Sequence, residues 1–253
     1  MKKALTVAGF DPTGGAGIQA DLKVFRALGV YGLSVVSSLT AQNTEGVRGV
    51  MPVPGEFVKT QLSVLLTDIV PEATKTGMLY SESSVTVLAH IIRKYSLKNV
   101  VVDPVMVSSS GKRLVGKNTP TALRKKILPL CTVITPNIFE ASVLTGIDIK
   151  TRADMEKAAV CLKSYGPANV IVTGGHLEGV ALDILYDGEF HYLRSRKKEG
   201  EYHGTGCVFS AALAALLAKG LSVRAAAEGA KRFMTTALKK SFSTGRGMKL
   251  LNI

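Results

Sequence analysis

The chain has no tryptophan, only three cysteines and few acidic residues. Cys131, Cys161 and Cys207 are odd in number and widely spaced, which excludes a disulfide framework and a zinc-binding cysteine pattern. Although 46% of the residues are hydrophobic, no apolar run approaches the roughly 18–20 residues needed to cross a bilayer. We therefore expect a protein of the reducing cytoplasm that has no membrane partner.

The shortage of acidic residues leaves an excess of positive charge. There are 32 lysines and arginines against 19 acids, giving a formal net charge of +13. Such charge suits either nucleic acid or small polyanions such as nucleotides and phosphorylated metabolites. The densest basic cluster, residues 194–198, is brief and has no interleaved aromatic residues. We interpret it first as a solvated loop, then as a phosphate-attracting segment, and expect no nucleic-acid partner.

Strand-like and helix-like patterns alternate along the chain, which at 253 residues is long enough to bury a full core. No repeat, low-complexity segment or linker divides it, so we expect one domain over residues 1–253. Residues 3–8 are interpreted as a first core strand rather than a signal peptide, because Asp11 and glycines interrupt the apolar run early. Six or more strands alternating with helices predict an α/β fold, with a doubly wound, mainly parallel sheet flanked by helices.

Residues 203–207, His-Gly-Thr-Gly-Cys, precede an alanine- and leucine-rich run at 210–220. Gly204 and Gly206 permit a tight turn, and the run has high helix propensity, so a loop entering a helix N-terminus is predicted. The free N–H groups of such a helix can hold a phosphoryl group. Cys207 would lie in the first turn, where a thiolate is favoured. A glycine turn before a buried helix, with a small core cysteine, explains this stretch equally well.

A second glycine-rich segment, residues 9–17, follows the first predicted strand. It has neither the dinucleotide-binding glycine spacing nor the lysine of a P-loop. Its four glycines indicate close approach of the backbone to a neighbouring strand or a ligand. Because Asp11 and Asp21 bracket the turn, we favour a ligand.

Polar residues follow several predicted strands, at the end of the sheet where ligands bind in open α/β folds. Gln42, after the strand at 33–39, has donors and an acceptor that can read the edge of a heterocycle, although a turn-capping amide is the simpler role. Asp103 follows a buried valine strand and suits a metal ion or phosphate-bound water. Glu140 falls in the first turn of a helix opened by Asn137, where capping is the simpler role. The polar segment 108–113 suits a mobile flap.

With these residues assembled, the chain resembles the ribokinase-like superfamily. Within it, the resemblance is to the hydroxymethylpyrimidine and phosphomethylpyrimidine kinases of thiamine biosynthesis, and it covers nearly the whole chain. The motifs that carry it are ALTVAGFD at 4–11, TAQNT at 40–44, VDPVMV at 102–107, TPN at 135–137, Gly-His at 175–176 and HGTGC at 203–207.

The resemblance implies a ribokinase-like three-layer α/β/α fold and a dimeric kinase that uses ATP and Mg²⁺. Its substrates would be 4-amino-5-hydroxymethyl-2-methylpyrimidine and then the monophosphate of that compound. The implied pyrimidine contacts are Gly9, Ala16, Asp21, Gln42, Met78 and Val105. The implied Mg²⁺ residues are Asp103 and Glu140, and the nucleotide residues are Asn137, Thr173, Gly175 and Lys112. The implied catalytic residues are Gly204, Thr205, Gly206 and Cys207, with Cys207 as acceptor of the hydroxyl proton.

Two departures from the family pattern leave alternatives open. Thr173 stands where the family usually has lysine, so a nucleotide contact is either lost or supplied by Lys112 or Arg113. Phe10 and Thr13 replace two serines of the first loop, and Phe10 adds bulk near the expected pocket. The alternatives are a pyridoxal, pyridoxine or pyridoxamine kinase with the same site, and a catalytically silent ligand-binding homologue. His176 is interpreted as a loop histidine rather than a base.

Overall fold

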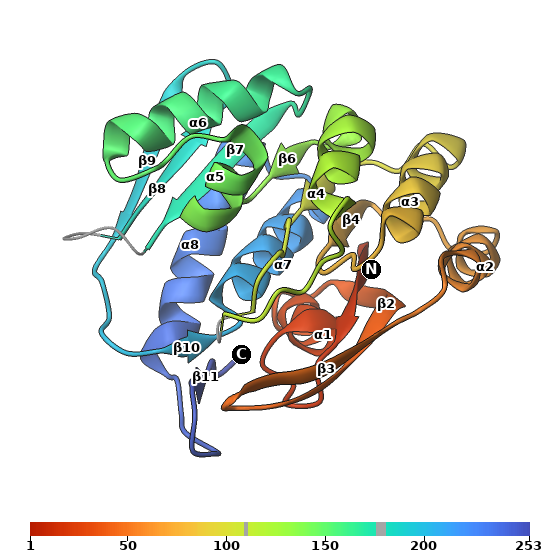
Figure 1. The fold of residues 1–253 in the computed structure, drawn as a ribbon, viewed down its shortest axis with the longest axis horizontal. Coiled ribbons are helices and arrows are strands. Elements are labelled where there is room, and N and C mark those ends of the chain that lie inside the picture. The colour runs from red at the N-terminus through yellow and green to blue at the C-terminus, as the bar shows by residue number, and fades with distance from the viewer. Residues whose placement is uncertain (109–110, 176–180) are drawn as a thin grey trace.

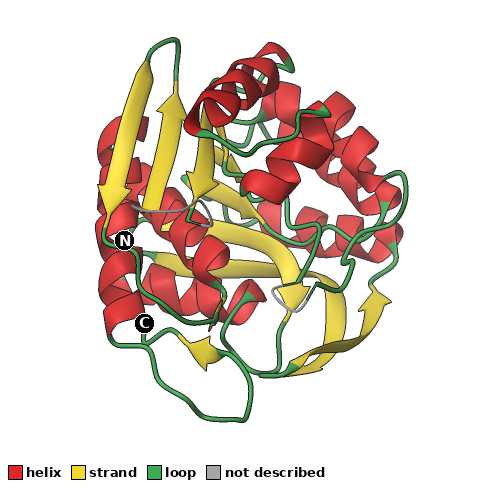
Figure 2. Cartoon of the chain, turned by 60° about the vertical axis from the view of Figure 1, so that its left-hand side comes forward, coloured by secondary structure: helices red, strands yellow, loops and turns green. Residues whose placement is uncertain are grey.

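The computed structural model describes residues 1–108, 111–175 and 181–253. Within them a nine-stranded sheet has the order β3-β2-β1-β4-β5-β6-β7-β8-β9. Helices cover both faces of this sheet (Figures 1 and 2). The structure confirms the predicted three-layer α/β fold with a mainly parallel sheet.

The centre of the sheet is parallel, because its strands are joined by helical crossovers. The parallel strands are β1 (Lys3–Phe10), β2 (Tyr31–Asn43), β4 (Ala73–Thr76), β5 (Val100–Val102), β6 (Val133–Ile134) and β7 (Asn169–Gly174). The antiparallel strands at the edges are β3 (Gly46–Pro52), β8 (Ala181–Tyr186) and β9 (Phe190–Ser195). Two short strands, β10 (Tyr202–His203) and β11 (Lys249–Leu250), pair with each other outside the main sheet.

Strand β2 is longer than the sequence indicated. It was expected to end at residue 39, but it continues to Asn43 and pairs with β3. Gln42 therefore lies on a strand opposite Val47, and not in a loop after the strand. The predicted hairpin around residues 187–188 is confirmed as the turn between β8 and β9.

The helices are divided between two apolar cores, one on each face of the sheet. One core contains α1 (Gly17–Ala27), α7 (Thr205–Ala218) and α8 (Val223–Lys239). The other contains α2 (Gly55–Leu66), α3 (Glu82–Lys94), α4 (Thr119–Ala122), α5 (Ile138–Thr145) and α6 (Arg152–Ser164). Alternate residues of one strand enter opposite cores, as Val100 and Val101 do, because side-chain direction alternates along a strand. No helix in the described ranges is long and apolar enough to cross a membrane.

Helix α7 is the most buried helix of the fold. It is apolar around its whole circumference and packs on α1, α8 and the sheet strands β1, β4 and β5. A helix of this composition is stable only inside a core. Its position fixes the first turn of α7 at the end of the sheet where the parallel strands stop.

Candidate active site

The two glycine-rich segments lie directly against each other. Gly204 has φ of +81°, and a Cβ there would lie 1.9 Å from the Gly15 carbonyl oxygen. Gly17 has φ of +59°, and a Cβ there would lie 2.3 Å from the Gly9 carbonyl oxygen. Only glycine fits either position without moving the backbone. Packing between backbone segments thus accounts for both glycines. For Gly17 the sequence favoured a ligand, and for Gly204 it left both explanations open.

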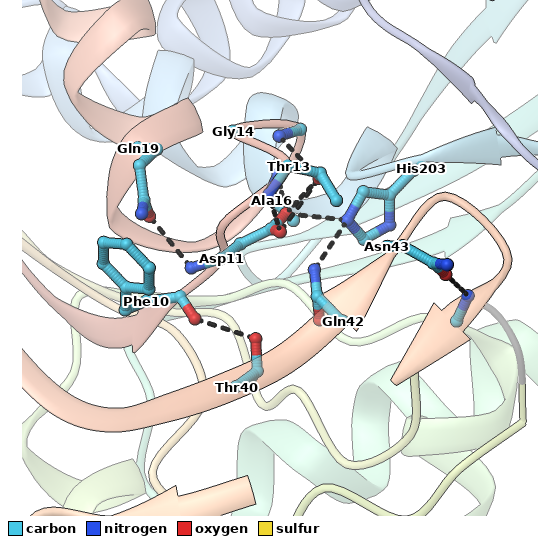
Figure 3. Close-up of polar contacts among 12 residues, drawn as sticks. Phe10, Asp11, Thr13, Gly14, Ala16, Gln19, Thr40, Gln42, Asn43 and His203 are labelled. Atoms are coloured by element: carbon cyan, nitrogen blue, oxygen red, sulfur yellow. Dashed lines mark hydrogen bonds and ion pairs between the residues drawn. The ribbon is translucent and has the colours of Figure 1, made fainter. Parts of the chain in front are cut away.

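A hydrogen-bonded cluster around Asp11 ties this junction to β2 (Figure 3). The Asp11 carboxylate accepts hydrogen bonds of 2.8 Å from the Thr13 and Ala16 backbone N–H groups, and lies 2.8 Å from His203 Nε2. Burial favours the neutral acid, but the contact with His203 and the hydrogen bonds from Thr13 lower the pKa of Asp11. The Gln42 side-chain nitrogen lies 3.3 Å from the same imidazole nitrogen, so three distant segments meet at His203.

Gln42 also lines an open cavity of about 440 Å³. Thr13 and Asn43 line the same cavity, with Arg246 from the C-terminal segment. Several of the residues that line it carry polar side chains, which could form hydrogen bonds with a small molecule. Gln42 is thus placed where an incoming ring could meet its amide.

The first turn of α7 presents free backbone N–H groups. Its first intrahelical bond runs from the Val208 N–H to the Gly204 carbonyl, so the N–H groups of Thr205, Gly206 and Cys207 precede the helical ladder. A Cβ at Gly206 would meet nothing within 4 Å, so the turn faces open space. The arrangement suits an anion, which is one of the two explanations that the sequence left open.

The expected ionisation of Cys207 is wrong. Position in the first helical turn favours a thiolate, but burial raises the pKa of Cys207 to about 12 in this structure. Nearby Lys75 opposes this rise, and the carboxyl groups of Asp103 and Asp21 add to it. The thiol is therefore protonated at neutral pH in the free protein.

A buried cluster of charges lies behind this turn. Lys75, on β4, donates hydrogen bonds of 2.9 and 2.8 Å to the two carboxylate oxygens of Asp21. Asp21 also accepts one of 2.6 Å from Thr6, so its carboxylate is fully engaged inside the core. On its other side Lys75 Nζ lies 3.8 Å from Asp103 Oδ2, and that oxygen accepts a 2.9 Å hydrogen bond from Ser210 of α7.

Glu140 extends the cluster toward α5. Asn137 caps α5 by accepting from the Glu140 N–H at 2.9 Å, and Glu140 accepts from the Asn137 N–H at 2.9 Å, which confirms the capping role. The other Glu140 oxygen accepts from the Met106 N–H. Burial, and then the neighbouring Asp103, raises the pKa of Glu140 to about 8. Asp103 and Glu140 are thus close neighbours.

The remaining residues expected to contact the pyrimidine lie at the ends of β1, β4 and β5. A Cβ on Gly9 would lie 2.7 Å from Met78 Cε, so these two residues touch. Met78 is buried, and Val105 follows Asp103, to whose carbonyl its N–H donates. Ser38, whose buried hydroxyl has no described partner, lies beside Gly9 and was not singled out from the sequence.

The residues expected to contact the nucleotide form a less connected group. Thr173 pairs with Asn137 where β7 ends, and Gly175 is exposed next to it. The Lys112 ammonium instead contacts the Arg48 carbonyl of β3. His176 and part of the expected flap, residues 109–110, lie outside the described residues.

Three side chains at the centre of the site, Lys75, Ser210 and His203, had no assigned role at the sequence level. His203 stood inside a motif that was recognised for its glycines. Lys75 could have been noticed from the sequence, because it is a charged residue in a short strand whose other residues suit burial. Its partner Asp21 is 54 residues away in sequence, so only the fold brings them together.

Known proteins similar to this chain include kinases of the family that the sequence resembles. A family model described as phosphomethylpyrimidine kinase matches residues 11–252. The chain is 45% identical over 246 residues to the thiamine biosynthesis bifunctional protein of Geobacter sulfurreducens. This match covers 96% of the chain and 50% of the Geobacter protein. The chain is 43% identical over 246 residues to the hydroxymethylpyrimidine/phosphomethylpyrimidine kinase of Streptomyces coelicolor, covering 96% of this chain and 91% of that protein.

A solved structure gives a similar match. An ADP complex of Bacillus subtilis pyridoxal kinase superposes with a TM-score of 0.92 at 41% identity, covering 100% of this chain and 97% of that chain. The chain therefore spans about half the length of the Geobacter bifunctional protein, but almost the full length of the Streptomyces and Bacillus proteins.

Proposed function

Because the chain belongs to the phosphomethylpyrimidine kinase family, we propose that it transfers phosphate from ATP to 4-amino-5-hydroxymethyl-2-methylpyrimidine and then to the resulting monophosphate. These two steps yield the diphosphate used in thiamine biosynthesis. The observation that carries the proposal is the open first turn of α7, whose free N–H groups lie beside the buried Asp103 and Lys75.

The first step requires stabilisation of negative charge. The hydroxymethyl oxygen attacks the γ-phosphorus, the bond from that phosphorus to the β–γ bridging oxygen breaks, and ADP leaves. Positioning and electrostatic stabilisation dominate such transfers. The backbone N–H groups of Thr205, Gly206 and Cys207 supply the stabilising dipoles for the transferred group.

For proton transfer we keep Cys207 as the proposed acceptor of the hydroxyl proton. A protonated thiol cannot accept that proton, so the role requires the thiol to ionise when the substrates bind. The neighbouring Lys75 ammonium, which acts to lower the pKa of the thiol, would hold the thiolate after its proton is lost to solvent. The backbone N–H groups of α7 need no such change, and in this proposal they carry the larger share of the stabilisation.

For substrate binding we propose that Gly9, Ala16, Met78 and Val105 surround the pyrimidine while Gln42 reads its edge. The contact of Gly9 with Met78 supports grouping these two residues. The cavity beside Gln42, which the other four residues do not line, supports only the role of Gln42. Asp21 was expected to touch the ring, but its carboxylate is fully engaged with Lys75 and Thr6. We therefore assign Asp21 an indirect role through Lys75.

Mg²⁺ is proposed to accompany ATP. The described residues contain no group of three or more histidine, cysteine or acidic side chains that could hold a metal ion by themselves. Mg²⁺ at phosphates usually needs only one or two carboxylates together with phosphate oxygens and waters. Asp103 and Glu140 would supply them, with Glu140 giving up the proton that its raised pKa retains in the free protein. When bound, the ion would supply positive charge beside the phosphates.

On the nucleotide side we propose Asn137, Thr173 and Gly175 near the ATP phosphates, with Lys112 reaching in from the flap. Their position at the ends of β6 and β7 supports the first three. Lys112 would have to leave its contact with the Arg48 carbonyl of β3.

A vitamin B6 kinase is the second candidate, supported by the similarity to Bacillus subtilis pyridoxal kinase. A coupled ADP-release assay would compare the hydroxymethylpyrimidine, its monophosphate and pyridoxal as acceptors. We expect turnover of both pyrimidines with little on pyridoxal. Activity on pyridoxal alone would establish the second candidate, and no activity on any acceptor would indicate a silent homologue.

We further propose a cytoplasmic homodimer. The need for ATP and the three free cysteines support the compartment. An interface between subunits is supported by exposed apolar side chains on three neighbouring elements. These are Tyr31 on β2, Met51 on β3, and Phe57 and Val64 on α2. Sedimentation equilibrium would test the assembly, and a single species at the monomer mass would contradict it.

A further inference from the structure

Lys75 lies at an unusual place for a lysine. All four residues of β4 are buried, and the side chain of Lys75 is 0% exposed in the middle of the sheet. Burying an ammonium group carries a large desolvation penalty unless anionic partners compensate for it. Such a residue requires an explanation beyond the packing of a strand.

The position of the ammonium is fixed from one side by Asp21 of α1. Both carboxylate oxygens accept from Lys75, and Thr6 of β1 holds the carboxylate in turn. Gly77 leaves room for the group, since a Cβ there would lie 3.1 Å from Lys75 Nζ and 2.9 Å from Ala8 Cβ. The backbone and Asp21 therefore aim Lys75 in one direction.

The other side of Lys75 faces Asp103 rather than apolar core. Nζ is 3.8 Å from Asp103 Oδ2, the oxygen that also accepts from Ser210 Oγ at 2.9 Å. Although burial opposes the charged form, the neighbouring Asp21, and with it Asp103, raises the pKa of Lys75, so it remains an ammonium. One fixed cation thus lies beside two carboxylates and behind the first turn of α7.

A second buried pair, Lys231 of α8 with Asp183 of β8, shows what a simpler arrangement looks like. These groups lie 2.6 Å apart, and the Gly174 N–H completes the coordination of the carboxylate. In the described ion pairs no second carboxylate faces Lys231. This pair needs only a structural role, whereas Lys75 carries an additional acidic neighbour in the proposed active site.

We propose that Lys75 is a positioning residue for phosphoryl transfer. Held by Asp21, it keeps the Asp103 carboxylate in place against Ser210 and supplies a permanent positive charge behind the anion-binding turn of α7. The inference rests on the proposed kinase function, because it is this reaction that places developing negative charge at the turn.

The test replaces both members of the Lys75–Asp21 pair, since a single change would leave a buried charge without its partner and impair folding. Lys75→Met with Asp21→Asn removes one charge of each sign. The matched control, Lys231→Met with Asp183→Asn, does the same at the second pair. Thermal unfolding first shows that both double variants fold, and kcat and KM are then measured with the acceptor that the wild-type protein prefers.

We expect kcat of the Lys75→Met/Asp21→Asn variant to fall by about 100-fold, in the range seen for loss of one group that stabilises transition-state charge. KM for the acceptor and for ATP should change by less than about 3-fold, because the lost interaction matters mainly in the transition state. The control variant should keep kcat within about 3-fold of the wild type. Equal kcat in the two double variants, or a loss expressed in KM alone, would overturn the inference.

A crystal structure of the folded Lys75→Met/Asp21→Asn variant separates this inference from the proposed function. Were the wild-type protein inactive on every acceptor, the proposed function would fail, but the position of Asp103 would still decide the positioning role. Loss of the Asp103–Ser210 hydrogen bond supports that role. An unchanged Asp103 carboxylate contradicts it.

Discussion

The two buried lysine–aspartate pairs look alike but lie in different surroundings. Each joins one helix to one strand of the sheet, and each is almost completely shielded from water. Lys231 and Asp183 satisfy each other near the edge strands, whereas Lys75 also faces Asp103 at the glycine-rich loops. A buried ion pair is by itself weak evidence for function. The additional carboxylate and the open helix turn distinguish the first pair as part of a site.

The largest expected effect comes from removing one lysine at a time. Lys75→Met and Lys231→Met each leave a buried carboxylate uncompensated, so each should lower the free energy of unfolding by about 3–5 kcal/mol. Urea denaturation would measure both. The two variants should lose similar amounts of stability. At a temperature where both remain folded, only Lys75→Met should lose turnover. Equal loss of turnover in both would erase the distinction between the two regions.

Glu140, which lies in the first region, should make stability depend on pH. Its pKa is about 8 in the folded protein against an ordinary value of 4.5, so between these values the folded state holds a proton that the unfolded chain releases. Stability should therefore decline as pH rises from about 5 to 8, by on the order of a few kcal/mol.

Denaturation at several pH values in the presence of a chelator would measure this slope. Glu140→Gln should flatten it. The variant should also be less stable at pH 5, because glutamine keeps only one of the two acceptors used by the Asn137 and Met106 N–H groups. An identical slope in the variant would assign the titration to another group.

A smaller effect should follow from filling the space beside Lys75. In Gly77→Ala the new methyl would lie 3.1 Å from Nζ and 2.9 Å from Ala8 Cβ, so the ammonium must shift. We expect a loss of stability of about 1–3 kcal/mol and a lower kcat. Gly49→Ala on β3 is the control, since its nearest neighbour would be 3.6 Å away. Unchanged kcat in Gly77→Ala would show that the exact place of the ammonium is unimportant.

The smallest predicted effect concerns substrate recognition, which the Lys231 region does not share. Gln42→Ala should raise KM for the hydroxymethylpyrimidine about 10-fold, equivalent to about 1.4 kcal/mol, with little change in KM for ATP. Ser34→Ala is a control on the same strand, because Ser34 lies outside the cavity beside Gln42. An unaltered KM in Gln42→Ala would place the ring elsewhere.

Much of the fold follows from local patterns in the sequence. Buried valine strands alternating with amphipathic helices predicted the parallel sheet, and Asp187-Gly188 predicted the last hairpin. The antiparallel β3 was missed, because β2 was assumed to end before its polar residues. Beyond Leu39, β2 pairs with β3 alone, so its polar residues did not mark its end.

The site was predictable where its residues follow strands and not where it depends on long-range burial. Asp103, Glu140 and Cys207 meet as expected, since they occupy the same end of the sheet. The thiol of Cys207 was expected to ionise from its place in a helix, but desolvation outweighs that local effect. Lys75 could not be paired from the sequence, because its partners come from α1 and the end of β5.

The most direct measurement is a ³¹P NMR time course with ATP, Mg²⁺ and the hydroxymethylpyrimidine as sole acceptor. The account predicts that a monophosphate ester resonance appears first and is then replaced by the paired resonances of a diphosphate ester, while ADP accumulates. ADP formation without any new phosphate ester, or a reaction that stops at the monophosphate, would contradict it.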